Sequence, residues 1–251
     1  MFVDTHFHLN MIEEDKERRK KIIDSMVNEG LSQGINIYTS PDAFLEDIEI
    51  IKYLNEKGFK VACGWYPEYS PSEERIRKLE EIIKNHNIFA IGEIGLEYYH
   101  MHKPKNEQIE LFEMQLDLAQ RYNKPVIIHS RDAFEDTFST LKKYDLKMII
   151  HCFSGTREIV KKYLDIGCFI SFAGNLTFRK ATDLHDSIKY VPLDRLFFET
   201  DAPFLAPVPL RGQKNYPYFV KHTYQFASSL LNLSFEYLVN KVYENWENLL
   251  K

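Results

Sequence analysis

Short apolar runs alternate with longer amphipathic segments along the whole chain. The runs are nearly continuous stretches of Ile, Val, Phe and Cys, which predicts strands that are buried on both faces. The amphipathic segments carry apolar residues at spacings of three and four, as helices that pack by one face do. Strands are predicted at 1–6, 35–39, 60–64, 88–93, 126–129, 147–151, 168–172 and 196–200. Helices are predicted near 13–29, 41–58, 106–122, 181–190, 217–231 and 235–250, from a cap at Ser70, and around 134–141 and 159–166.

Eight strand–helix units in 251 residues predict a (β/α)₈ TIM barrel. We expect residues 1–251 to form one domain with an extra C-terminal helix. The competing fold is an open, doubly wound α/β sheet, which normally has a glycine-rich phosphate loop after its first strand. The first turn here, residues 6–10, contains no glycine. The barrel is therefore favoured, and its active site is expected at the C-terminal ends of the strands.

Composition and charge narrow the class of protein. A net charge of −5 excludes a general nucleic-acid coat protein, although a small site for the end of a nucleic acid needs only a few local cations. No signal-peptide pattern opens the chain, and no apolar run approaches the roughly 18 residues of a membrane span. Three cysteines without Cys-x-x-Cys spacing indicate reduced thiols and a cytoplasmic protein. No membrane contact and no obligate protein partner is expected.

Six side chains of the types that bind metals fall at or just after the ends of predicted strands. His6 and His8 lie two residues apart, so a continued strand would point both imidazoles to one side. One such residue alone is more often a hydrogen-bonded rim residue, but six at one end of a barrel point to a shared role. Nitrogen and oxygen ligands suit divalent Zn, Mn, Co or Mg ions and do not select among them. The six residues are His6, His8, Glu93, His129, His151 and Asp201.

The motifs around these residues resemble those of the TatD family of metal-dependent hydrolases, within the amidohydrolase-like barrels. The resemblance extends over the whole chain in the family's order and spacing. Its motifs are VDTHFH (3–8), AIGEIGL (90–96), PVIIHSRDA (125–133), HCFSG (151–155), ETDAPFLAP (199–207) and Arg211-Gly212 with Asn215 close behind.

The resemblance implies a pair of divalent metal ions. One ion would lie on His6, His8, Glu93 and Asp201, and the second on Glu93, His129 and His151, with Glu93 as the bridge. The activity it implies is phosphodiester hydrolysis, and we expect a 3′-to-5′ exonuclease on single-stranded DNA or RNA ends. Glu93 and Asp201 would be the catalytic residues, with Asp201 accepting the proton of the attacking water.

Two other functions stay open on the sequence. Some family members act on aminoacyl-tRNA esters, so a D-aminoacyl-tRNA deacylase, or a hydrolase of another small ester or amide, would use the same centre. A non-catalytic metal-binding scaffold is the third reading, which the presence of all six ligands disfavours.

Substrate contacts are expected from the loops around the same mouth. Arg131 and Arg211 are candidates to clamp a phosphate. The alternative for Arg131 is a surface salt bridge to Asp132 or Glu135, and for Arg211 a solvated loop charge. Backbone N–H groups of Ser154 and Gly155 could meet an anion. Tyr66 stands where the family usually has histidine and can donate a hydrogen bond to phosphate. At the rim, Tyr98 and Tyr99 could stack on a base or simply pack as aromatic rim residues. Glu97 and His100 also depart from the family pattern.

Overall fold

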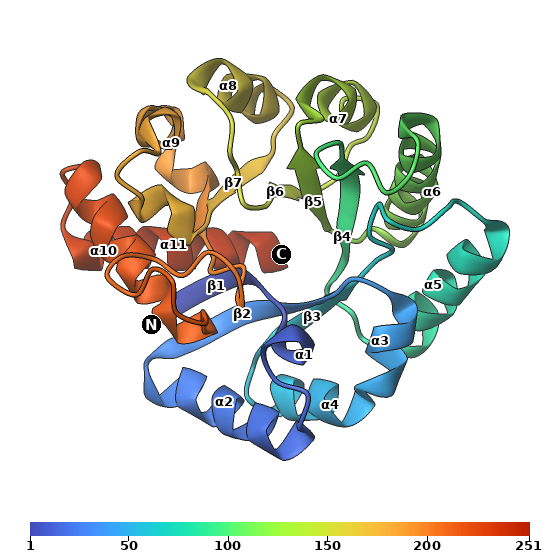
Figure 1. Ribbon diagram of the computed structural model, residues 1–251, viewed down its shortest axis with the longest axis horizontal. Coiled ribbons are helices and arrows are strands. Elements are labelled where there is room, and N and C mark those ends of the chain that lie inside the picture. The colour runs from blue at the N-terminus through green and yellow to red at the C-terminus, as the bar shows by residue number, and fades with distance from the viewer.

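Eight parallel strands form a barrel surrounded by helices, as the sequence predicted (Figure 1). The computed structural model describes residues 1–251. The strands follow one another around the barrel in chain order: β1 (Phe2–Phe7), β2 (Leu31–Tyr38), β3 (Lys60–Cys63), β4 (Ala90–Glu97), β5 (Val126–Arg131), β6 (Met148–Ile150), β7 (Phe169–Phe172) and β8 (Leu196–Phe198).

Eleven α-helices accompany the strands, with four short 3₁₀ helices. The α-helices are α1 (Leu9–Ile12), α2 (Lys16–Asn28), α3 (Pro41–Glu46), α4 (Ile48–Glu56), α5 (Glu73–Asn85), α6 (Lys105–Tyr122), α7 (Phe134–Leu141), α8 (Arg157–Asp165), α9 (Thr182–Ser187), α10 (Val220–Leu230) and α11 (Phe235–Leu250). The 3₁₀ helices are η1 (Gly174–Thr177), η2 (Ile188–Tyr190), η3 (Leu193–Arg195) and η4 (Pro217–Phe219).

Side-chain caps fix where several helices begin. Asp15, Ser40, Ser72 and Ser234 each accept a hydrogen bond from a backbone N–H in the first turn of α2, α3, α5 and α11, and a cap of this kind contributes about 1 kcal/mol. The cap of α5 is Ser72, so the sequence prediction of Ser70 was wrong by two residues. Both serines are followed within three positions by an acidic residue, and the sequence pattern alone did not separate them.

The single helix predicted over 41–58 is two helices, α3 and α4, separated at Asp47. The Asp47 carboxylate is buried, lies 2.5 Å from the Arg19 guanidinium and accepts a hydrogen bond from the Tyr38 hydroxyl at 2.7 Å. These tertiary contacts hold Asp47 outside a regular helix. The break between α3 and α4 therefore could not be predicted from the spacing of apolar residues.

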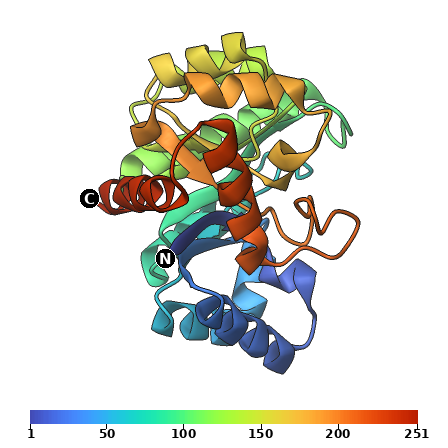
Figure 2. The ribbon, with the colours of Figure 1, turned by 90° about the vertical axis from the view of Figure 1, so that its left-hand side faces the viewer.

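The C-terminal helix α11 covers the N-terminal end of the barrel. Figure 2 shows it on the side away from the long loop that follows β8. Asn245 on α11 donates to the carbonyls of Leu193 and Leu196 at 2.7 and 2.9 Å, and Trp246 packs against Phe89. The barrel's other end therefore stays open for a site.

No helix has the length and apolar character needed to cross a membrane.

Two strands carry bulges close to the predicted ligands. On β1, three residue steps from Asp4 to Phe7 face two steps on β2, and on β4 three steps from Ile91 to Ile94 face two on β5. A bulge places an extra residue on one strand and re-aims its side chains. The two bulged segments contain His6 and Glu93, so these irregularities position the site.

Candidate metal centre

The structure brings the six predicted side chains together at the C-terminal end of the barrel. Their positions along the strands differ from the prediction in detail. Glu93 lies within β4, which continues to Glu97, and His129 lies two residues before the end of β5. His8 and His151 come directly after β1 and β6, whereas Asp201 lies three residues beyond β8.

The two carboxylate oxygens of Glu93 face different groups of imidazoles. Oε2 lies 3.3 Å from Nε2 of His6 and 3.7 Å from Nε2 of His8. Oε1 lies 2.6 Å from Nδ1 of His129 and 2.9 Å from Nε2 of His151. Glu93 is therefore the centre of the cluster, with one oxygen for each side.

Asp201 completes the side formed by His6 and His8. Its Oδ1 lies 3.5 Å from Nε2 of His8 and 3.8 Å from Nε2 of His6. Its backbone N–H donates to the His6 carbonyl at 2.9 Å, and its φ is +55°. The backbone of the β8 loop is thus fixed directly to β1, which holds the carboxylate against the two imidazoles.

Electrostatics favours an ionised carboxylate among cationic groups. Burial alone would raise the pKa of Glu93, but the charge of His151 and hydrogen bonds from His129, His151 and His6 outweigh it and hold that pKa well below its usual range. Burial lowers the pKa of His151, yet Glu93 and Glu199 raise it well above the ordinary value. The surrounding imidazoles thus keep the buried Glu93 carboxylate ionised.

The donor set fits divalent metal ions. Nε2 of His6 and Nε2 of His8 lie only 3.0 Å apart, and the rings of His6 and His151 stack with centroids 3.9 Å apart. Imidazole nitrogens converging this closely suit a shared cation better than separate protons. The ligand atoms of His6, Glu93 and His151, and those of His6, His8 and Asp201, lie within 4.8 Å of one another.

Three buried acidic residues that the sequence did not single out as site residues support the cluster. Glu199 accepts hydrogen bonds from Nδ1 of His151 at 3.1 Å and from the Cys152 N–H at 2.9 Å. Asp4 accepts from the Thr200 N–H, and burial raises its pKa well above the usual value. Glu97, noted only as a family departure, lies 3.2 Å from Nε2 of His129. The available signal was an acidic residue inside an otherwise apolar run.

Tyr66 lies directly beside a candidate ligand. Its hydroxyl is 3.2 Å from Nε2 of His129 and 3.4 Å from Oε2 of Glu97. Burial raises the pKa of this phenol, so it remains a protonated donor. The residue that departs from the usual family histidine therefore occupies the edge of the cluster.

Five of the six side chains, all except the fully buried His6, line a cavity of about 630 Å³. Of the predicted substrate contacts, Tyr66, Arg131 and Ser154 line this cavity. Arg211 lines a neighbouring cavity instead, and Gly155 lines neither.

The rim residues of the same mouth have partners of their own. The Arg131 guanidinium lies over the Tyr99 ring at 4.1 Å and 3.9 Å from Oε2 of Glu97. The Tyr98 hydroxyl donates a hydrogen bond to Asp136 at 2.9 Å, which restricts rotation of the Tyr98 side chain. His100 lines the cavity and has Nδ1 3.4 Å from Oε2 of Glu97.

Comparison with known proteins agrees with this geometry. The profile of the family described as TatD related DNase matches residues 3–251. The chain is 34% identical over 254 residues to the uncharacterized metal-dependent hydrolase YcfH of Escherichia coli K12, covering 98% of this chain and 94% of the relative. It is 33% identical over 256 residues to the uncharacterized metal-dependent hydrolase YabD of Bacillus subtilis 168, covering 100% and 99%. The crystal structure of YJJV, a TatD homologue of E. coli K12, matches with a TM-score of 0.89 at 26% identity, covering 99% of this chain and 97% of that one. The chain therefore belongs to the TatD family and is a metal-dependent hydrolase.

Proposed function

We propose that the protein is a phosphodiesterase that removes nucleotides from the 3′ ends of single-stranded DNA or RNA with two divalent metal ions. The observation that carries the proposal is the division of the site by Glu93, whose two oxygens face separate groups of donors. The description of the matching family as TatD related DNase supports a nucleic-acid substrate.

The residues on the two sides of Glu93 would hold the two ions. His6, His8 and Asp201 would hold one, and His129 and His151 the other, with Glu93 shared. Bound there, two divalent ions would draw charge from a phosphate oxygen and make a nearby water more acidic. Because all donors are nitrogen or oxygen, Zn, Mn, Co and Mg all suit the site. The nearby Cys152 thiol has a pKa raised well above its usual value by burial, so no thiolate competes.

Asp201 is the proposed general base. It is the most exposed of the carboxylates in the cluster, with 15% of its side chain accessible, and it lines the cavity. The hydrogen bond and charge of His8, with those of His6 and His151, overcome the effect of burial and lower the pKa of Asp201. An ionised carboxylate at the floor of the cavity can accept the proton of an attacking water.

Two further residues on the cavity wall would bind the substrate. Arg131 offers a guanidinium that lies over the Tyr99 ring, and Tyr66 offers a protonated hydroxyl. Both groups donate hydrogen bonds, as a phosphate requires.

The three free cysteines, none paired, are consistent with a reducing cytoplasmic location.

The test is degradation of 5′-labelled single-stranded DNA by metal-stripped protein supplemented with Mg²⁺, Mn²⁺ or Zn²⁺. We expect stepwise shortening from the 3′ end that requires metal and falls at least about 100-fold in Glu93→Ala and in Asp201→Asn. Glu158→Gln, an exposed position on α8, is the matched control and should keep the full rate. No cleavage of DNA or RNA by protein shown to hold two metal ions would overturn the nuclease proposal and direct the search to aminoacyl esters.

A further inference from the structure

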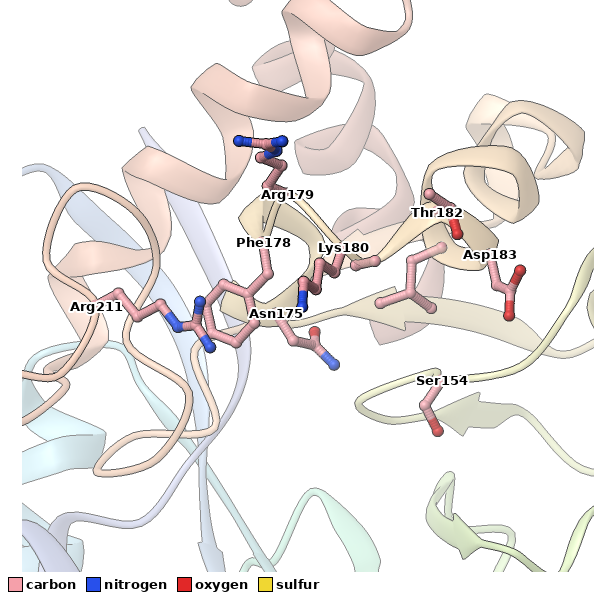
Figure 3. A pocket seen from close by; sticks show the side chains of 10 residues that line it. Ser154, Asn175, Phe178, Arg179, Lys180, Thr182, Asp183 and Arg211 are labelled. Carbon is pink, nitrogen blue, oxygen red and sulfur yellow. The ribbon is translucent and has the colours of Figure 1, made fainter.

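A second cavity adjoins the candidate metal centre. It has a volume of about 730 Å³ and lies between the segment after β7, the loop carrying Arg211 and the turn after β6 (Figure 3). Ser154 and Asn175 line both cavities, so the second cavity continues from the first. A chain bound at the metal centre therefore has a path into it.

The wall of the second cavity carries unpaired positive charge. Lys180 and Arg211 line it, and neither makes an ion pair with a carboxylate within 4.0 Å. Figure 3 shows the Lys180 ammonium and the Arg211 guanidinium on the side of Asn175, with Arg179 directed away from it. The Arg211 guanidinium lies over the Phe178 ring at 4.3 Å, which fixes its orientation. The cavity's one carboxylate, Asp183, is on the opposite side from Arg211.

Asn175 supplies an independent indication of a ligand. Its side-chain oxygen is buried and has no hydrogen-bond partner. Buried polar atoms are nearly always paired, because leaving one unpaired costs about 1–3 kcal/mol. Asn175 lines both cavities. Its unpaired oxygen needs a donor such as a sugar hydroxyl, and its NH₂ group can donate to a phosphate.

We infer that the second cavity binds the next internucleotide phosphate, on the 5′ side of the scissile linkage. Lys180 and Arg211 neutralise this phosphate and Asn175 hydrogen-bonds to it or to the adjoining sugar. The assignment depends on the proposed function, in which the metal cavity takes the scissile phosphate. It accounts for how an acidic protein of net charge −5 holds a polyanion: the needed cations are gathered in one cavity beside the chemistry.

Substrates of two lengths distinguish the contribution of the second cavity from that of the metal centre. A dinucleotide without terminal phosphates has only the scissile phosphate, whereas a trinucleotide has one more for the second cavity. In Lys180→Ala/Arg211→Ala, we expect kcat/KM for the trinucleotide to fall at least about 10-fold, since two charge-assisted contacts are lost. Dinucleotide cleavage should stay within about 2-fold. The slope of log(kcat/KM) against log[salt] should fall by roughly 0.7 for the trinucleotide, since one phosphate is no longer neutralised.

Lys21→Ala/Lys52→Ala is the matched control, because it removes the same charge from α2 and α4, across the barrel from α9 (Figure 1). It should leave both substrates unchanged. An equal fall on both substrates in Lys180→Ala/Arg211→Ala, or no fall on either, would overturn the subsite.

A binding measurement distinguishes failure of the subsite from failure of the proposed function. If the wild-type protein cleaves neither substrate, fluorescence anisotropy of a labelled trinucleotide with a non-hydrolysable phosphonate at the terminal linkage replaces the rates. Binding that weakens about 10-fold in Lys180→Ala/Arg211→Ala but not in the control supports the phosphate site while the nuclease proposal fails. Equal binding by the two double variants overturns the phosphate site.

Discussion

Glu199 fixes the orientation of one candidate ligand. Its carboxylate is fully buried and accepts a hydrogen bond from Nδ1 of His151, which leaves Nε2 of the same ring directed at Glu93. A carboxylate behind a ligating imidazole sets the tautomer and raises its basicity. Glu199 also accepts from the Cys152 N–H, so it ties the ring to the backbone of the following turn.

Glu199→Gln should therefore weaken metal binding by about 10- to 100-fold while the barrel stays folded. The glutamine keeps the size of the side chain but loses its charge, so the His151 ring is held less firmly and is less basic. Competition of the stripped protein with a chromogenic chelator for Zn²⁺ measures the change. Unaltered affinity in this variant would show that the carboxylate behind His151 has no influence on the centre.

The seam between β1 and β8 is the element on which the site depends. No ladder joins β1 to β8, and an isolated bridge instead joins Phe7 of β1 to Ala202 in the loop after β8. Asp4 compensates: its carboxylate accepts from the N–H of His6 at 3.1 Å, and from the N–H and hydroxyl of Thr200 at 3.0 and 2.6 Å. One buried side chain thus joins the strand that carries His6 to the segment that carries Asp201.

Asp4→Ala should lower the free energy of unfolding by about 3 kcal/mol or more, because it leaves three buried donors without an acceptor. Urea unfolding followed by circular dichroism measures this value. Asp194→Ala, at an exposed position, is the comparison and should change stability by no more than about 0.5 kcal/mol. A loss in Asp4→Ala no larger than in the comparison would mean that the bridge and loop hold the seam alone.

The strands and the shared direction of His6 and His8 could be predicted from the sequence, whereas the aim of Glu93 within its strand could not. Apolar runs located all eight strands, since strands buried on both faces read as continuous hydrophobic segments. Alternation of side chains within a strand, by contrast, fails at a bulge, and Glu93 lies in the bulged segment of β4. At Gly95, φ is +143° and an added Cβ would lie 2.0 Å from the His129 carbonyl oxygen, so only glycine permits this pairing of β4 with β5.

At the scale of the whole molecule, the order of the strand–helix units determined where the ligands meet. Parallel strands closed into a barrel bring all their C-terminal ends to one mouth, so side chains from His6 to Asp201 could be grouped from their places in the sequence. The division between the two cavities could not be predicted in this way. It depends on which face of the loop after β7 carries Lys180 and on where the Arg211 loop packs, and periodicity carries no information about loops.

Metal removal should destabilise the entire barrel, because the candidate ligands come from β1, β4 and β5 and from the turns after β6 and β8. A metal that binds only the folded state adds about 2.7 kcal/mol at 100 times its Kd. For a chain of this size that corresponds to a fall in Tm of roughly 5–10 °C with chelator, reversed by adding metal back. Differential scanning calorimetry of the protein with and without chelator measures it. Glu93→Ala, which lacks the residue shared by both sides of the cluster, should melt at a temperature that responds far less to the chelator. If the wild-type protein is shown to contain metal and its Tm does not change with chelator, the metal is bound somewhere other than between these strands.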